Sequence, residues 1–188
     1  MINKAKDEDV VVLVDPENNV IKTAPKLETH NKNTPLHRGF SVFLFNKNRE
    51  LLLQKRSFKK KTWPGIWSNS CCGHPMLNEP PIEAGERRLK FELGIEPESI
   101  VEILPDFSYK VEKDGIVENE LCPVLVAFTN QEPVINKDEV ENVRWVKWKK
   151  FLEEIEQNPG YYSAWSEIES KQLSKNKKFN DLIPNFMS

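Results

Sequence analysis

Cysteine, histidine and glycine are scarce in this sequence of 188 residues, which has three cysteines, three histidines and seven glycines. Three cysteines, two of them adjacent, exclude a disulfide framework and are typical of reduced thiols in the cytoplasm. Apolar runs are short: Val10–Val14 and Val124–Phe128 have five residues each, whereas a membrane-spanning helix needs about 20. The first residues reach acidic side chains before any apolar stretch, unlike a secretory signal. We therefore expect a cytoplasmic protein without a membrane segment.

No charge of one sign dominates, because 27 Lys and Arg stand against 29 Asp and Glu, a net charge of −2. This balance gives no global attraction to nucleic acid or to an anionic membrane, so an anionic ligand must be met by a local cluster of cations. With 38% hydrophobic residues the chain can build a core, and its length suits one domain. We expect a flexible segment over residues 1–9 and a single domain over residues 10–188.

Short β-rich runs separated by turn residues predict a mixed α/β fold whose strands are mostly antiparallel. Residues 63–75 contain too much Pro, Gly, Ser and Asn for a regular element and predict a loop. Helices are expected beyond residue 148. The predicted strands cover residues 10–14, 20–22, 39–45, 51–55, 100–111, 117–128 and 143–148.

Residues 81–93 predict a helix, because an apolar stripe of Ile82, Leu89 and Leu93 runs along them, with a proline in the first turn and a glycine after the last. Arg88 and Glu92 lie one turn apart, just beside this stripe. Taken alone, the pattern is also that of an ordinary amphipathic helix with an exposed ion-pairing face.

All three histidines could join two carboxylates in a metal site. Glu118 and Glu120 share one face of a predicted strand, because side chains alternate along a strand. Imidazole and carboxylate ligands suit Zn, Mn, Fe or Mg better than a thiolate-selecting metal. The spacing of His30, His37 and His74 fits no helical metal motif, so surface histidines beside a solvated glutamate pair remain the alternative.

The segment from Gly73 to Ile95 resembles the Nudix box, a loop and helix that present carboxylates to metal-bound diphosphates. Arg88 and Phe91 stand where the hydrolases place glutamates, which leaves Glu92 without its acidic companions. A hydrolase needs that cluster to hold metals and activate water. The residues that carry the likeness are Gly73, Glu79, Arg87, Arg88, Leu89, Phe91, Glu92, Gly94 and Ile95.

Four further segments are similar to the signature segments of the type I isopentenyl diphosphate isomerases, within the same superfamily. They are Thr34 to Ser41 (TPLHRGFS), Thr62 to Pro75 (TWPGIWSNSCCGHP), Gly115 to Pro123 (GIVENELCP) and Tyr162 to Trp165 (YSAW). The likeness runs from about Val10 to Trp165. It implies a Nudix-like α/β/α sandwich with a mixed, largely antiparallel sheet.

The resemblance implies a metal-dependent isomerase that interconverts isopentenyl diphosphate and dimethylallyl diphosphate by protonation and deprotonation on opposite faces, through a tertiary carbocation. Its partner is a small isoprenoid diphosphate, and we expect a monomer or weak dimer that binds no nucleic acid and no membrane. The implied ligands of Mn²⁺ or Zn²⁺ are His30, His37, His74, Glu118 and Glu120. Glu92, helped by the backbone of Cys72, is implied to hold Mg²⁺, and Lys26, Arg56, Lys60 and Arg88 to bind the diphosphate.

Cys72 and Glu120 are the implied proton-transfer pair, with Tyr109 beside Glu120 and Trp165 presenting its π face to the carbocation. A loop cysteine beside glycine is usually inert, and the adjacent Cys71 complicates the assignment. A Nudix pyrophosphohydrolase is the alternative function, and a non-catalytic diphosphate sensor is a third.

Overall fold

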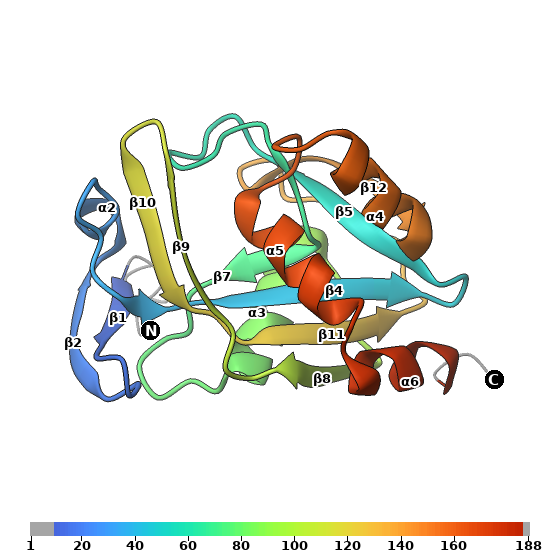
Figure 1. Ribbon diagram of the computed structural model, residues 1–188, viewed down its shortest axis with the longest axis horizontal. Coiled ribbons are helices and arrows are strands. Elements are labelled where there is room, and N and C mark those ends of the chain that lie inside the picture. Colours follow the sequence, from blue (N-terminus) through green and yellow to red (C-terminus); the bar gives the residue numbers. More distant parts are fainter. Residues whose placement is uncertain (1–9, 186–188) are drawn as a thin grey trace.

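The computed structural model describes residues 10–185, with side chains to residue 183, and arranges the strands in two sheets (Figure 1). The segment predicted to be flexible, residues 1–9, lies outside the described residues. The smaller sheet has the strand order β2-β1-β3-β10-β9, and the larger has the order β12-β5-β4-β11-β8, with β6 paired to β5 and β7 paired to β4. The strands are β1 (Val10–Val14), β2 (Val20–Pro25), β3 (His37–Arg38), β4 (Phe40–Asn46), β5 (Glu50–Arg56), β6 (Trp67–Ser68), β7 (Cys71–Gly73), β8 (Ser99–Leu104), β9 (Ser108–Lys113), β10 (Ile116–Leu121), β11 (Val124–Thr129) and β12 (Val140–Lys147).

Four of the described helices cover the two faces of the larger sheet, and the short helix α2 (Lys26–Thr29) contacts the smaller one. Strand β4 shows the division, because Phe43 and Phe45 face one core while Val42 and Leu44 face the other. The first core also contains residues of α4 (Trp148–Gln157), α5 (Ala164–Leu173) and α6 (Lys177–Asn185), and the second contains residues of α3 (Pro81–Leu93). The predicted α/β/α sandwich with a mixed, largely antiparallel sheet is confirmed. Among the named strands of residues 10–185, β4 with β11 and β3 with β10 are the pairs that run parallel.

Two of the predicted strands are each divided between the two sheets. The run 100–111 breaks into β8 and β9 at Pro105, and the run 117–128 breaks into β10 and β11 at Pro123. Proline has no backbone N–H to donate to a ladder, so it interrupts pairing at the point where the chain changes sheet. The carbonyl of Pro123 still accepts a hydrogen bond from the N–H of Ser41, at 3.1 Å. These breaks place the β9–β10 hairpin beside β3, over one end of the larger sheet (Figure 1).

Helix α3 has the predicted bounds, and its end at Gly94 has a left-handed φ of 66° that suits glycine. Leu89 and Leu93 are fully buried, as expected, but Ile82 is 36% exposed. Arg88 and Glu92 are buried instead, so the alternative of an exposed ion-pairing face is wrong. The helix therefore directs an ion pair into the protein.

The prediction of a loop over residues 63–75 is wrong in part, because the segment contains the short strands β6 and β7. Their pairing comes from neighbours that are distant in sequence: β7 lies against β4, with Cys72 opposite Ser41. This pairing fixes the backbone of Cys72 on the edge of the larger sheet. Among the described residues, no helix is long and apolar enough to cross a membrane.

Candidate active site

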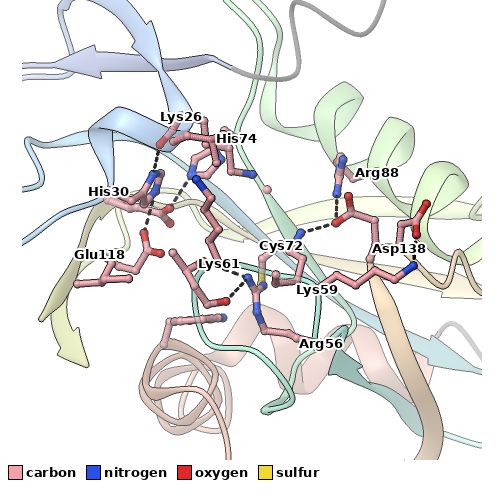
Figure 2. A pocket seen from close by; sticks show the side chains of 18 of the residues that line it. Lys26, His30, Arg56, Lys59, Lys61, Cys72, His74, Arg88, Glu118 and Asp138 are labelled. Carbon is pink, nitrogen blue, oxygen red and sulfur yellow. Dashed lines mark hydrogen bonds and ion pairs between the residues drawn. The ribbon is translucent and has the colours of Figure 1, made fainter. Parts of the chain in front are cut away.

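A cavity of about 430 Å³ lies where the smaller sheet meets the end of the larger one (Figure 2). It brings together side chains from α2, β5, β7, β9, β10, α3 and α5, together with loops. In Figure 2, His30, His74 and Glu118 lie at one end of the view together with Lys26, whereas Arg88 and Lys59 lie at the other end, and Cys72 lies between them. The residues that line it include Lys26, His30, Arg56, Lys60, Cys72, His74, Arg88, Tyr109, Glu118, Glu120, Glu139 and Trp165.

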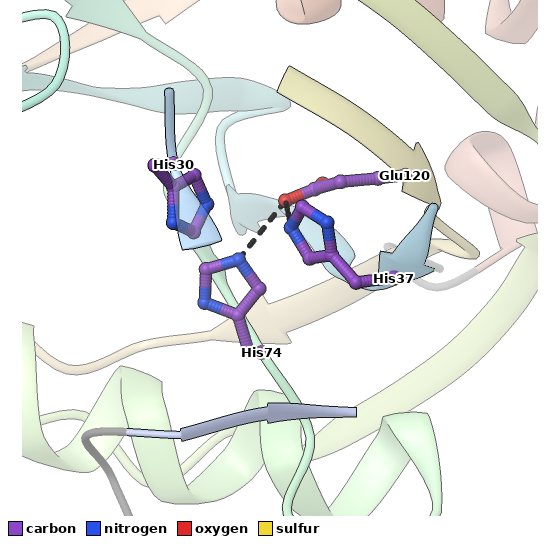
Figure 3. Close-up of side chains that lie close together, drawn as sticks. All are labelled: His30, His37, His74 and Glu120. Atoms are coloured by element: carbon purple, nitrogen blue, oxygen red, sulfur yellow. Dashed lines mark hydrogen bonds and ion pairs between the residues drawn. The ribbon is translucent and has the colours of Figure 1, made fainter. Parts of the chain in front are cut away.

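Three histidines and Glu120 converge at the first end (Figure 3). Their ligand atoms all lie within 4.8 Å of one another. Strand register explains the convergence, because Glu120 lies opposite His37 on β3 and opposite Tyr109 on β9. The Nε2 atom of His74 lies 3.1 Å from Oε1 of Glu120, and Nε2 of His37 lies 3.4 Å from the same oxygen.

Glu118 extends this group, since its Oε2 lies 3.1 Å from Nε2 of His30. The Nδ1 atoms of His30 and His37 lie 2.7 and 2.9 Å from the backbone oxygens of Lys26 and Pro35. A proton on Nδ1 leaves Nε2 as the free nitrogen that a metal would use. Within the described part of the chain, His37 Nε2 and Glu118 Oε2 are buried without a hydrogen-bond partner. Buried polar atoms left in this way, in a set of imidazoles and carboxylates, fit a divalent metal ion.

The electrostatics of the cluster also suit a cation. Burial and the nearby positive charge of Lys26 lower the pKa of His74 well below 6.5, which leaves the imidazole neutral. Burial opposes the charge of Glu120, but the interactions with His37 and His74 outweigh burial and hold the pKa of this carboxyl well below its usual range. Burial opposes protonation of His37, but the nearby Glu120 carboxylate outweighs burial and raises the pKa of this imidazole. The neutral His74 imidazole and the ionised Glu120 carboxylate are forms that ligate metals, and a metal ion would displace any proton from His37 Nε2.

The Cys72 thiol has neutral neighbours. It donates a hydrogen bond to Oδ1 of Asn69, at 3.0 Å, and its sulfur lies 3.5 Å from the hydroxyl of Ser41. Burial, with the nearby Glu169 carboxyl, raises the pKa of the Cys72 thiol to about 12, so it is protonated at neutral pH. The adjacent Cys71 lies in the apolar core on the α3 side, and it is not among the residues that line the cavity.

Aromatic rings form part of the cavity wall near Glu120 and Cys72. The hydroxyl of Tyr109 donates to Oε2 of Glu120 at 2.9 Å, and burial with the nearby Glu120 charge raises the pKa of Tyr109 well above 10. The Tyr109 and Trp165 rings have centroids 6.1 Å apart, and Trp63 packs edge-on against Trp165 at 5.3 Å. Trp165 is 4% exposed. Such a wall excludes water and offers a π face to a cation.

The second end of the cavity is basic. Burial, followed by the charges of Lys60, Arg88 and Arg56, lowers the pKa of Lys26 to about 8. Cations gathered in this way attract a multiply charged anion such as a diphosphate. Glu139 holds part of the group together, since it pairs with Lys60 and lies 3.2 Å from a guanidinium nitrogen of Arg88.

Glu92 lies apart from the cavity lining. Its Oε1 accepts a hydrogen bond from Arg88 Nε at 3.0 Å, and its Oε2 accepts one from Gln54 at 2.9 Å. Glu92 is 2% exposed. The structure thus gathers two predicted histidines, His30 and His74, around one cavity with Glu118, Glu120, Cys72, Tyr109, Trp165 and the four cations. His37 lies buried within the metal cluster without lining the cavity, and Glu92 lies behind Arg88.

Three residues that contact the site were not predicted from the sequence. Asn69, Ser41 and Glu139 contact the predicted residues, but none was singled out. Asn69 lies inside the segment from Thr62 to Pro75, so the motif contained it without indicating its role. Glu139 follows a charged run near β12, where sequence gives no signal of the cavity.

Most of the chain matches a known protein family. The NUDIX domain family matches residues 35–166. The chain is 39% identical to the isopentenyl-diphosphate Delta-isomerase of Salmonella typhi over 172 residues, 91% of this chain and 95% of that protein. It is 41% identical to the protein of the same name from Saccharopolyspora erythraea, over 87% of this chain and 84% of that one. The chain belongs to the isopentenyl-diphosphate Delta-isomerases of the NUDIX family.

Solved structures agree on the fold of this isomerase family member. The crystal structure of the DR0079 protein of Deinococcus radiodurans has a TM-score of 0.68 and 17% identity, and the match covers 87% of this chain and 98% of that one. A MutT protein of Methanosarcina mazei has a TM-score of 0.60 and 19% identity, over 75% and 94% of the two chains. Isomerase relatives at about 40% identity favour isomerase activity over the alternative of a pyrophosphohydrolase.

Proposed function

We propose that this protein interconverts isopentenyl diphosphate and dimethylallyl diphosphate in the cavity between its two sheets. The observation that carries the proposal is the lining itself, in which Cys72 and Glu120 share one cavity with an aromatic wall and a cluster of cations. This combination suits a small apolar olefin with a diphosphate at one end. The relatives' names supply the substrate.

The diphosphate would bind at the basic end, against Lys26, Arg56, Lys60 and Arg88. Lys60 and Arg88 currently share the carboxylate of Glu139. An incoming diphosphate oxygen would take the place of that carboxylate, because charge-assisted hydrogen bonds to phosphate are among the strong ones. The position of the anion would then set the position of the five-carbon chain.

Two divalent ions complete the proposed site. The donor set of His30, His37, His74, Glu118 and Glu120 fits Mn²⁺ or Zn²⁺, and we assign Mg²⁺ to Glu92 with the backbone of Cys72 and the diphosphate. When bound, the first ion would supply positive charge that makes the Glu120 proton easier to exchange. For Glu92 to reach the substrate, its hydrogen bonds with Arg88 and Gln54 have to rearrange.

The chemistry moves one proton on and another off. A proton added to the terminal methylene of isopentenyl diphosphate gives a tertiary carbocation. The CH₂ group between the cationic carbon and the carbon that bears the diphosphate then loses a proton, which gives the allylic product. We assign these transfers to Cys72 and Glu120 on opposite faces of the chain. The reaction is reversible, so each group acts as acid in one direction and as base in the other. Trp165 would stabilise the cation through its π face, and the buried wall would exclude water.

Proton NMR of isopentenyl diphosphate with the protein and Mg²⁺ in heavy water tests this function. We expect dimethylallyl diphosphate that carries deuterium and keeps its diphosphate. Released phosphate or pyrophosphate would instead indicate a hydrolase, and unchanged substrate with Mg²⁺, Mn²⁺ and Zn²⁺ would indicate a sensor. We further propose that the protein acts in the cytoplasm as a monomer or weak dimer.

A further inference from the structure

Asn69 is fully buried, and both the nitrogen and the oxygen of its side-chain amide form hydrogen bonds. Its nitrogen donates to the backbone oxygens of Val42 and Cys71, at 3.1 and 3.0 Å. Both partners can only accept, so the orientation of the amide is fixed by its surroundings, with Oδ1 directed to the other side.

On that other side, Oδ1 of Asn69 accepts from three donors. They are the Ser68 hydroxyl at 2.8 Å, the Cys72 thiol at 3.0 Å and the indole N–H of Trp165 at 3.3 Å. Cys72 and Trp165 come from elements far apart in the sequence, β7 and α5. One carbonyl oxygen therefore contacts both the thiol proposed to move a proton and the ring proposed to stabilise the cation.

Buried hydroxyls continue this network to the start of α5. The Ser68 hydroxyl lies 2.8 Å from that of Ser163, and Ser163 lies 2.9 Å from Ser166 in the first turn of the helix. All three serines are at most 3% exposed. A satisfied buried polar network restricts its members to one arrangement, so the helix that bears Trp165 is fixed relative to β6 and β7.

We infer that Asn69 is a positioning residue of the isomerisation, which holds the Cys72 sulfur and the Trp165 ring in one fixed relation across the cavity. It does not line the cavity, so it acts through the other two residues. The inference rests on the proposed function. A shift of about 1 Å in the position of a catalytic group can lower a rate by about 100-fold. A change in the distance between the Cys72 sulfur and the Trp165 ring should therefore be detectable as a change in kcat.

The test compares Asn69→Ala, Asn69→Asp and a control, Ser170→Ala. Ser170 is buried on the same helix and donates to the backbone of Ser166, without contact to the thiol or the ring. We expect Asn69→Ala to lower kcat by about 10- to 100-fold with KM for isopentenyl diphosphate changed less than about threefold. Ser170→Ala should keep kcat within about twofold.

Asn69→Asp separates positioning from folding. It keeps an acceptor for Cys72 and Trp165 but loses both N–H donors and buries an acid, so its melting temperature should be the lowest of the three. Its kcat should nevertheless lie above that of Asn69→Ala. A purely structural role would rank kcat and melting temperature in the same order, and that result overturns the inference.

The remaining outcomes are also decisive. If Asn69→Asp does not fold, Asn69→Ala is compared with Ser170→Ala, and a kcat for Asn69→Ala within threefold of the unmodified protein overturns the inference. An unmodified protein that leaves isopentenyl diphosphate unchanged contradicts the proposed function itself. Normal turnover by both the unmodified protein and Asn69→Ala removes only the role of Asn69.

Discussion

The two sides of the cavity hold their reactive groups in opposite environments. Cys72 faces the neutral groups of Asn69 and Ser41, and burial raises its pKa to about 12. Glu120 faces imidazoles and a phenol, and the interactions with His37 and His74 overcome the effect of burial and lower its pKa. One group is thus a thiol and the other a carboxylate at neutral pH. Pairs of groups whose pKa values are pushed apart are typical of acid–base catalysis.

The largest effect should come from removing either member of this pair. We expect Cys72→Ala and Glu120→Gln each to lower kcat by about 10³- to 10⁴-fold, because each removes a proton-transfer group. The rates are measured by the conversion of isopentenyl diphosphate. Cys71→Ala is the matched control, since that thiol lies in the core, and it should keep kcat within about threefold. Turnover by Cys72→Ala at the normal rate would remove the thiol from the mechanism.

Loss of the metal at the histidine cluster should affect the Glu120 side of the cavity and leave the Cys72 thiol unchanged. A chelator should abolish turnover, and the unfolding free energy should drop by about 2.7 kcal/mol relative to protein with metal at 100 times its Kd. His74→Ala should lose bound metal, measured by elemental analysis, because its imidazole is part of the cluster. Cys72→Ala should retain it. Equal metal loss in the two variants would contradict the separation of the two sides.

The basic end should control affinity more than rate. We expect Lys60→Ala to raise KM for isopentenyl diphosphate by about 10- to 100-fold. This factor corresponds to the loss of one hydrogen bond to a charged group, which contributes about 1.5–3 kcal/mol to binding. Lys90→Ala is the control, because this exposed lysine pairs with Glu96 away from the cavity. A loss confined to kcat in Lys60→Ala would show that the diphosphate binds elsewhere.

The smallest predicted effect concerns pH. Because the pKa of Lys26 in the free protein is lowered to about 8, its ammonium loses its proton as the pH rises through 8. A bound diphosphate favours the charged form, so binding takes up a proton above that pH. We expect the Kd of a non-reactive diphosphate analogue to rise by about three- to tenfold from pH 7 to pH 9. Lys26→Met should bind more weakly at pH 7 and lose this rise, whereas an unchanged pH profile would exclude Lys26 as the titrating group.

Much of the fold followed from local patterns. Helix α3 was predicted to the residue, because its proline start, glycine end and apolar spacing are all local signals. The division of strands at Pro105 and Pro123 was missed, since a proline marks a break without saying that the chain enters a second sheet. Strands β6 and β7 were missed because they exist only through pairing with β5 and β4.

The site was predicted mainly by the family motifs. Residue spacing alone left the histidines ambiguous, because they meet only through the register of β3 and β10 and the loop after β7. The burial of Arg88 and Glu92 was also beyond the sequence, since a helical wheel shows which side chains share a face but not how deeply that face is covered. Glu92 as a metal ligand stays a prediction.

A crystal structure with a divalent metal and a non-reactive isopentenyl diphosphate analogue tests the opposition of the two sides most directly. We expect the five-carbon chain to lie between Sγ of Cys72 and the carboxylate of Glu120, with the diphosphate against Lys26, Arg56 and Lys60. The proposed mechanism would be contradicted if Cys72 and Glu120 lay on the same face of the analogue's carbon chain, or if its diphosphate lay outside the basic end of the cavity.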